Sequence, residues 1–208
     1  VISSGQVVTR RLREEGVDAV FVPKGYDQAL LRDLGCKRDI ELGFVGSTNS
    51  VAYSGRKALL DELAKVENLV VTRTNSGEEY LNTLNRIRFF VSADVGMGEY
   101  MIKNFEAMAC GCVLLAYDQG EDENRALGFV DMENLVLYRT VVELCDKLAQ
   151  LRADPAWAER IAVNGRMLAE SRYSFARIGA EVVQAMQAPL RSAPTPGWLC
   201  RLRNRLGV

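Results

Sequence analysis

A single carboxylate, Glu106, stands in an otherwise apolar or small run at residues 105–116. Such a run is typical of the last turns of a buried helix, a glycine break and a buried parallel strand. An ionised carboxylate is costly in apolar surroundings unless hydrogen-bond donors reach it. We therefore expect Glu106 to belong to a functional site. The alternative is a structural carboxylate whose hydrogen-bond partners all come from the protein itself.

Polar residues recur on one face of the predicted helix that contains Glu106. Glu99, Lys103 and Glu106 are spaced i, i+4 and i+7, and Cys110 follows at i+11. The helix begins after a glycine-containing turn at residues 94–98, so this face is suited to a nucleotide, with lysine at phosphate and carboxylate at ribose hydroxyls. The alternative is a pair between Lys103 and Glu106 at a partly exposed helix edge.

A second ligand-binding turn is predicted at residues 45–50, where an apolar strand runs into Gly46, Ser47 and further small polar residues. Arg56 and Lys57 follow at the start of the next predicted helix. Backbone amides, hydroxyls and cations are the groups that bind a diphosphate. An ordinary polar loop with solvated basic residues is the alternative. The chain has no Walker A lysine motif and no complete dinucleotide fingerprint.

The composition excludes several kinds of chemistry. The 208 residues include no histidine, which excludes Ser-His-Asp and Cys-His catalysis within the chain and most metallohydrolase chemistry. Five irregularly spaced cysteines indicate reduced intracellular thiols, and Cys110 and Cys112 lack the partners of a zinc site. We therefore expect a cytoplasmic protein without a zinc site.

Charge is nearly balanced, at −1, but it is unevenly distributed. Residues 189–208 contain four arginines and no acid, so residues 1–188 carry the acidic excess and make a poor candidate for nucleic-acid binding. In the tail, apolar residues interleave with arginines after a stretch with several prolines. This pattern predicts a peripheral contact with the inner face of a membrane. The alternative is a terminal helix that packs on another domain, or a disordered end.

Strand-like and helix-like segments alternate along the chain. Strands are predicted at residues 17–23, 40–46, 68–72, 88–92, 112–117 and 134–138. Helices are predicted at residues 6–15, 55–66, 77–86 and 100–110, near Asn124, and at 141–152, 155–171 and 174–187. The alternation is typical of an α/β fold with a doubly wound, Rossmann-like parallel sheet, here with extra C-terminal helices. Ligands of such sheets bind beyond the carboxyl ends of the strands, where both turns are expected to lie.

Residues 99–111, EYMIKNFEAMACG, resemble the R-x-F-E-A-M-A-C-G signature of group 1 glycosyltransferases with the GT-B fold, and most closely their spore-maturation-type subgroup. Further similarities follow the order of the family. They are the P-x-G-x-D motif within residues 16–27, the F-V-G-S strand within 39–47, the helix at 79–85 and an I-A-x-x-G-R motif within 160–166. The resemblance covers about residues 1–187.

The resemblance implies a domain that binds a nucleotide-diphosphate sugar as its substrate, with neither a metal nor another cofactor. Glu106 would accept the ribose hydroxyls, and Lys103, which stands where the subgroup has arginine, would neutralise the diphosphate. The other implied donor-binding residues are Gly46 and Ser47 at the phosphates, Arg56 as a further cation, Thr74 and Asn75 at the base, and Glu99 and Asn104 in the signature. Many group 1 enzymes have two glutamates eight positions apart, but residue 98 is glycine here, so Glu99 is one residue out of register.

The resemblance also implies a domain organisation. Residues 1–22 would end an N-terminal domain or form a linker, residues 23–188 would bind the nucleotide sugar, and residues 189–208 would form the basic tail. Recognition of a glycan, lipid-linked or protein acceptor, and any catalytic base, would lie largely on the N-terminal domain, so no catalytic residue is predicted here. We expect a glycosyltransferase of the hexosyltransferase type in polysaccharide biosynthesis. The alternatives are an epimerase-like isomerase of nucleotide sugars and a non-catalytic scaffold with a degenerate donor site.

Overall fold

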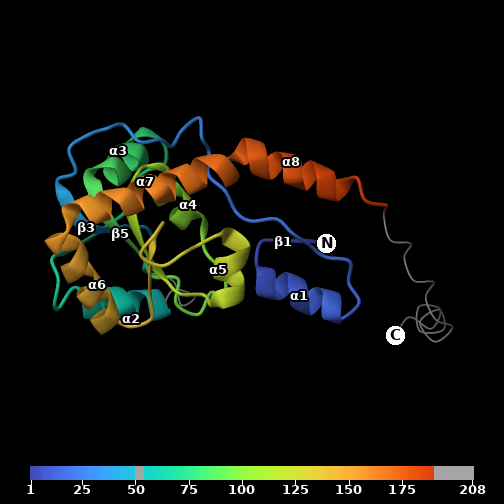
Figure 1. Ribbon diagram of the computed structural model, residues 1–208, viewed down its shortest axis with the longest axis horizontal. Coiled ribbons are helices and arrows are strands. Elements are labelled where there is room, and N and C mark those ends of the chain that lie inside the picture. Colours follow the sequence, from blue (N-terminus) through green and yellow to red (C-terminus); the bar gives the residue numbers. More distant parts are fainter. Residues whose placement is uncertain (50–53, 190–208) are drawn as a thin grey trace.

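The centre of the protein is a parallel sheet of five strands, seen in a computed structural model that describes residues 1–49 and 54–189 (Figure 1). The strand order is β4-β3-β5-β6-β7. The bounds are β3 (Ile40–Val45), β4 (Leu69–Thr72), β5 (Ile87–Ser92), β6 (Val113–Tyr117) and β7 (Val136–Tyr138). The predicted α/β fold with a doubly wound, Rossmann-like sheet is therefore confirmed.

Helices cover both faces of this sheet, as expected when parallel strands are joined by crossover connections. The helices between strands are α2 (Ser54–Leu63), α3 (Glu78–Arg86), α4 (Ile102–Ala109) and α5 (Glu121–Leu127). Three more follow the last strand, namely α6 (Val141–Ala153), α7 (Pro155–Arg172) and α8 (Phe175–Met186). In Figure 1, α3, α4 and α7 lie above the strands, α2 and α6 lie below them, and α8 extends away from the sheet.

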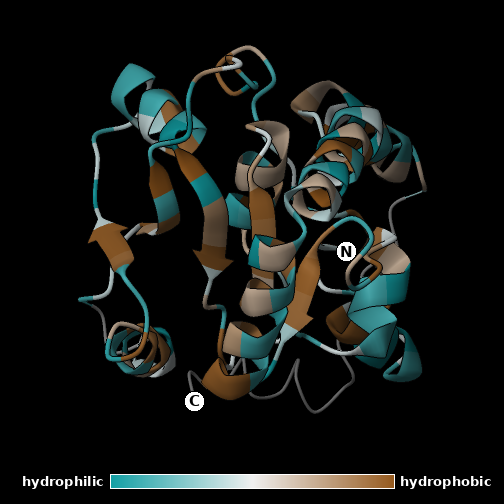
Figure 2. Ribbon diagram, turned by 60° about the vertical axis from the view of Figure 1, so that its left-hand side comes forward, coloured by the Kyte–Doolittle hydropathy of each residue, from teal (hydrophilic) through white to brown (hydrophobic). Residues whose placement is uncertain are grey.

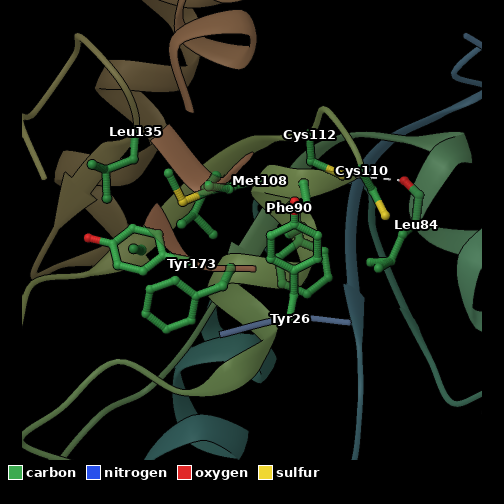
Figure 3. Close-up of a cluster of buried hydrophobic side chains, with 14 of the residues drawn as sticks. Tyr26, Leu84, Phe90, Met108, Cys110, Cys112, Leu135 and Tyr173 are labelled. Carbon is green, nitrogen blue, oxygen red and sulfur yellow. Dashed lines mark hydrogen bonds between the residues drawn. The ribbon is translucent and has the colours of Figure 1, made fainter. Parts of the chain in front are cut away.

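The core consists of two apolar clusters, one on each face of the sheet. Successive residues of a strand point to opposite faces, and β5 shows the result: Phe90 belongs to one cluster and Phe89 to the other. Figure 3 shows Phe90 gathered with Met108 of α4 and with Tyr173, which follows α7. The strands are mostly hydrophobic, with a few hydrophilic positions, while the helices combine hydrophilic and hydrophobic residues (Figure 2).

The first residues form a separate small unit. β1 (Ile2–Ser3) and β2 (Val20–Phe21) pair with each other in parallel, and α1 (Gln6–Glu14) joins them. The strand predicted over residues 17–23 is therefore shorter than expected. Polar contacts attach α1 to α5, since Glu123 accepts a hydrogen bond from the amide of Val7 at 2.9 Å and Asp122 pairs with Arg10. The domain boundary after residue 22 stays a prediction.

The start of α4 differs from the prediction, and the difference concerns the candidate site. The predicted helix begins at Tyr100, whereas α4 begins at Ile102. The carboxylate of Asp94 accepts a hydrogen bond from the amide of Met101 at 3.1 Å, which fixes the backbone before the helix. The prediction that Glu99 shares a helical face with Lys103 and Glu106 is therefore wrong, because Glu99 precedes the helix.

None of the helices in residues 1–49 and 54–189 combines the length and the hydrophobicity that crossing a membrane requires. The predicted membrane contact falls in the basic tail, of which residues 190–208 lie outside the described residues. That contact therefore stays a prediction.

Candidate functional site

The strand order places a crevice at the carboxyl edge of the sheet. β3 pairs with β4 on one side and with β5 on the other, so the connections that leave β3 and β5 diverge. Such a switch point is where open α/β sheets bind ligands. A cavity of about 400 Å³ lies here. Its lining includes the predicted residues Gly46, Ser47, Arg56, Thr74, Asn75, Lys103 and Glu106.

Gly46 ends β3 and lets the backbone approach α4 closely. Its amide donates a hydrogen bond to the carbonyl of Thr72 at 2.9 Å, which holds the turn against β4. A Cβ atom on Gly46 would lie 2.9 Å from the ring of Phe44 and 3.0 Å from Cε of Lys103. Only glycine fits this position without moving Lys103.

Glu106 and Lys103 project from α4 toward the same side chain, Tyr80 of α3. The hydroxyl of Tyr80 donates a hydrogen bond to Oε2 of Glu106 at 2.5 Å. The ammonium of Lys103 lies 4.9 Å from the centroid of the Tyr80 ring. Lys103 makes no ion pair with another described residue, so the alternative of an intrahelical pair with Glu106 is not what the structure shows.

The electrostatics of these groups follow from their burial. Burial lowers the pKa of Lys103 below its ordinary value, while the nearby carboxylate of Glu106 acts in the opposite direction. Burial, and then the charge of Glu106, raise the pKa of Tyr80 well above its ordinary value, so the phenol keeps its proton. The cavity therefore holds a desolvated cation and a carboxylate that already accepts one hydrogen bond.

Arg56 reaches the cavity but has its own partner. The side chain is buried, and its guanidinium pairs with the carboxylate of Asp94 at 3.1 Å. It also donates a hydrogen bond to the carbonyl of Ser47 at 3.3 Å, which ties α2 to the turn after β3. Arg56 thus shapes the turn, and Asp94 balances part of its charge.

Asp94 collects hydrogen bonds from several elements. Besides Arg56 and the amide of Met101, its carboxylate accepts from Ser92 at 3.0 Å and from the side-chain amide of Asn104 at 2.7 Å. Asp94 is only 2% exposed, and these donors provide the partners that a buried carboxylate needs. Among the residues that the structure describes, it is the residue that joins α2, β5 and α4 at this edge.

Two predicted site residues lie elsewhere. Asn104, in the first turn of α4, is fully buried, and its side-chain amide donates to Asp94 and to the carbonyl of Met101. Glu99 forms an ion pair with Lys24 at 2.6 Å and accepts a hydrogen bond from Ser4 at 2.7 Å. Neither residue lines the cavity, so the structure does not bring them together with the other candidates.

The loop after β4 contributes both predicted and unpredicted groups. Asn75 donates two hydrogen bonds to Glu79, one from its backbone amide at 3.1 Å and one from its side chain at 2.7 Å. Part of its hydrogen-bonding capacity is therefore used within the loop. Arg73 also lines the cavity and was missed, although a cation directly after a strand is a usable signal. Tyr80 was missed too, because its sequence context shows a helix but not which neighbour the side chain meets.

Within the described part of the chain, no three or more Cys, Asp or Glu side chains gather in an arrangement that could hold a metal ion. The positive charges that line the cavity are those of Arg56, Arg73 and Lys103. Metal-independent binding stays a prediction.

A parallel sheet of five strands with helices on both faces and a cavity at its switch point is a Rossmann-like α/β architecture. The profile of the glycosyl transferase-like family matches residues 27–184, and the chain belongs to this family. Membership in the spore-maturation-type subgroup stays a prediction. A search of curated proteins found no match.

Several solved structures share the fold. HepE from Anabaena, solved with UDP and glucose, superimposes with a TM-score of 0.72 at 14% identity, covering 91% of this chain and 63% of that one. A glycosyltransferase from Rickettsia africae superimposes with a TM-score of 0.71 at 11% identity, covering 91% of this chain and 64% of that one. Sucrose-phosphate synthase from Thermosynechococcus elongatus superimposes with a TM-score of 0.65 at 16% identity, covering 90% of this chain and 57% of that one. The chain thus spans about three-fifths of these structures, and the likeness shows a GT-B, Rossmann-like fold.

Proposed function

We propose that this chain is the donor-binding part of a glycosyltransferase that uses a nucleotide-diphosphate sugar. The observation that carries the proposal is the convergence of Glu106, Lys103 and Tyr80 on one cavity at the switch point, in a chain of the glycosyl transferase-like family. HepE, which shares the fold, has been solved with UDP and with UDP-glucose, so UDP is the first ligand to test.

The cavity offers a partner for each part of such a donor. Lys103, at the start of α4, would supply positive charge for the diphosphate, and the turn at Gly46 would bring the backbone amide of Ser47 beside it. Glu106 would accept the ribose hydroxyls. Thr74, after β4, would lie along the base, together with Arg73. When the sugar leaves, charge develops on the nucleotide diphosphate, and fixed cations and amides stabilise that charge.

The proposal extends to the reaction, in which the sugar is transferred without a metal to a glycan, lipid-linked or protein acceptor. Holding the anomeric carbon beside an acceptor requires a second surface. Because the chain spans about three-fifths of the structures it matches, we assign that surface to a further domain. We expect this chain to bind the donor and to catalyse transfer slowly or not at all. A peripheral membrane contact of residues 189–208 would bring a lipid-linked acceptor nearby.

The test is calorimetric titration of the chain with UDP, GDP, CDP and ADP, in buffer with a chelator and again with Mg²⁺. We expect one diphosphate to bind equally well in both buffers. Glu106→Ala should weaken it about tenfold, which is about 1.4 kcal/mol. The matched control is Glu181→Ala, which removes an exposed glutamate of α8 far along the chain from the cavity and should leave the affinity unchanged.

The other outcomes separate the competing functions. If no diphosphate binds, the donor-binding proposal fails and the scaffold interpretation gains support. If a diphosphate binds only with Mg²⁺, the metal-independent mechanism is wrong. If the chain, incubated with a UDP-sugar, yields the 2-epimer by NMR, the protein is an isomerase instead.

A further inference from the structure

We propose that Tyr80 is a positioning residue of the nucleotide site, which orients Glu106 for the ribose and keeps Lys103 available for the diphosphate. This inference rests on the proposed function of the cavity. It assigns a role to a residue of α3 that lies outside the glutamate-containing signature on α4.

The first step is the hydrogen bond between Tyr80 and Glu106. A phenol donating to a carboxylate at 2.5 Å is a short, charge-assisted interaction. A glutamate side chain has several rotatable bonds, and this contact fixes the position of Oε2. The second oxygen, Oε1, retains its accepting capacity. A pair of adjacent ribose hydroxyls therefore meets a carboxylate whose orientation is already set.

The second step is the contact between the Tyr80 ring and Lys103. Opposite charges three residues apart on a helix ordinarily attract each other and pair. Here the ammonium lies 4.9 Å from the ring centroid, and the hydroxyl of the same ring bonds the carboxylate. The ring thus gives the cation a cation–π partner that a diphosphate can outcompete. Both charges remain available to a ligand, although they stand on neighbouring turns of α4.

The third step is the protonation state of Tyr80. Burial and the charge of Glu106 raise the pKa of this phenol above its ordinary value. The hydroxyl is therefore a donor throughout the neutral and mildly alkaline range. The direction of the hydrogen bond from Tyr80 to Glu106 is set by this proton.

The test compares Tyr80→Phe with wild type. Phenylalanine keeps the ring and its contact with Lys103 but removes the hydroxyl. For the nucleoside diphosphate that the chain binds, we expect Kd to rise about five- to tenfold, in line with the loss of one hydrogen bond to a charged group. The 2′,3′-dideoxy analogue of the same diphosphate should bind both proteins with the same Kd. Inorganic pyrophosphate, measured by competition, should also bind both equally.

A second variant, Tyr80→Leu, removes the ring as well. This variant should bind pyrophosphate more weakly, because Lys103 is then free to pair with Glu106. In the Glu106→Ala background, Tyr80→Phe should cause no further loss, since the two residues act through one hydrogen bond. Thermal unfolding of each variant verifies that the protein remains folded.

The outcomes distinguish the two proposals. If wild type binds no nucleoside diphosphate, the proposed function fails. If wild type binds but Tyr80→Phe leaves Kd unchanged, or weakens the dideoxy analogue equally, the positioning role is wrong while the proposed function stands. If the losses from Tyr80→Phe and Glu106→Ala add fully, Tyr80 acts independently of Glu106 and the inference is overturned.

Discussion

The two edges of the central sheet both carry a charged cavity, but they use their charges differently. At the amino edge, a cavity of about 310 Å³ is lined by charged side chains that include Asp33, Arg38 and Arg166. Arg38 donates to the carbonyls of Ile87 and Cys110, each at 2.7 Å, and Arg166 pairs with Asp33 at 3.0 Å. These charges bind the protein itself, where they complete helix ends and strand starts.

At the carboxyl edge, the charged groups of the cavity of about 400 Å³ are engaged less fully by the protein itself. Lys103 faces an aromatic ring rather than a carboxylate, and Glu106 retains one oxygen beyond its bond to Tyr80. The size of a cavity and the number of its charges are therefore poor guides to function. What distinguishes a binding site is hydrogen-bonding capacity that the fold leaves unused.

The largest expected effect lies at the amino edge and concerns stability. Arg38→Ala leaves the buried carbonyls of Ile87 and Cys110 without this donor, so we expect it to lower the free energy of unfolding by about 3 kcal/mol. Urea unfolding measures this loss. The folded variant should bind the nucleoside diphosphate as wild type does.

The matched change at the carboxyl edge is Lys103→Met, which keeps the length of the side chain and removes the charge. Because burial disfavours the ammonium, this variant should unfold within about 1 kcal/mol of wild type while losing diphosphate affinity. Equal destabilisation by the two variants would contradict the distinction between the edges.

The next prediction concerns the pH dependence of diphosphate affinity. Burial lowers the pKa of Lys103, and the proposed function requires its charged form to bind the diphosphate. The affinity for the diphosphate should therefore be highest below the lowered pKa of Lys103 and should fall as the pH rises through that pKa. The loss of one ion pair would raise Kd up to about tenfold. Titrations between pH 7 and 10 check this. Lys103→Arg should show a flat profile because arginine stays charged, and a slope that persists in this variant would mean that another group titrates.

The smallest expected effect is that of Gly46→Ala. The added methyl group would meet Cε of Lys103 at 3.0 Å and the ring of Phe44 at 2.9 Å, so the lysine must shift. We expect Kd for the diphosphate to rise about three- to fivefold, since a displaced ion pair loses part of its energy. Gly179→Ala, at an exposed turn of α8 with open space around it, is the control and should leave Kd unchanged.

Much of this arrangement was predictable from local sequence. The alternation of apolar strands and helices predicted the sheet, and the carboxyl ends of its strands had to bring Gly46, Thr74 and Lys103 to one edge. Glu106 was recognisable because no other carboxylate interrupts its apolar run. These inferences depend on periodicity and chain order, both of which a sequence displays.

The rest depends on contacts between distant segments. Arg56 is expected at a diphosphate by its position after a turn, yet Asp94, which lies in another connection, takes part of its charge. Asp94 also sets the start of α4 and so removes Glu99 from the helix. The role of Tyr80 depends on how α3 packs beside α4, and no spacing within either helix determines that.

The network around Asp94 has a consequence for the thermodynamics of binding. The buried carboxylate of Asp94 pairs with Arg56 of α2 and accepts hydrogen bonds from Ser92 of β5 and from the amide of Met101, just before α4. Its backbone carbonyl accepts a further hydrogen bond from the side chain of Gln119 at 2.9 Å. The ends of α2, β5 and α4 beside the crevice are thus held together by the protein's own contacts. Under the proposed function, a nucleotide that enters would meet a preorganised surface, so little backbone entropy would be lost on association and more of the contact energy would be retained as affinity.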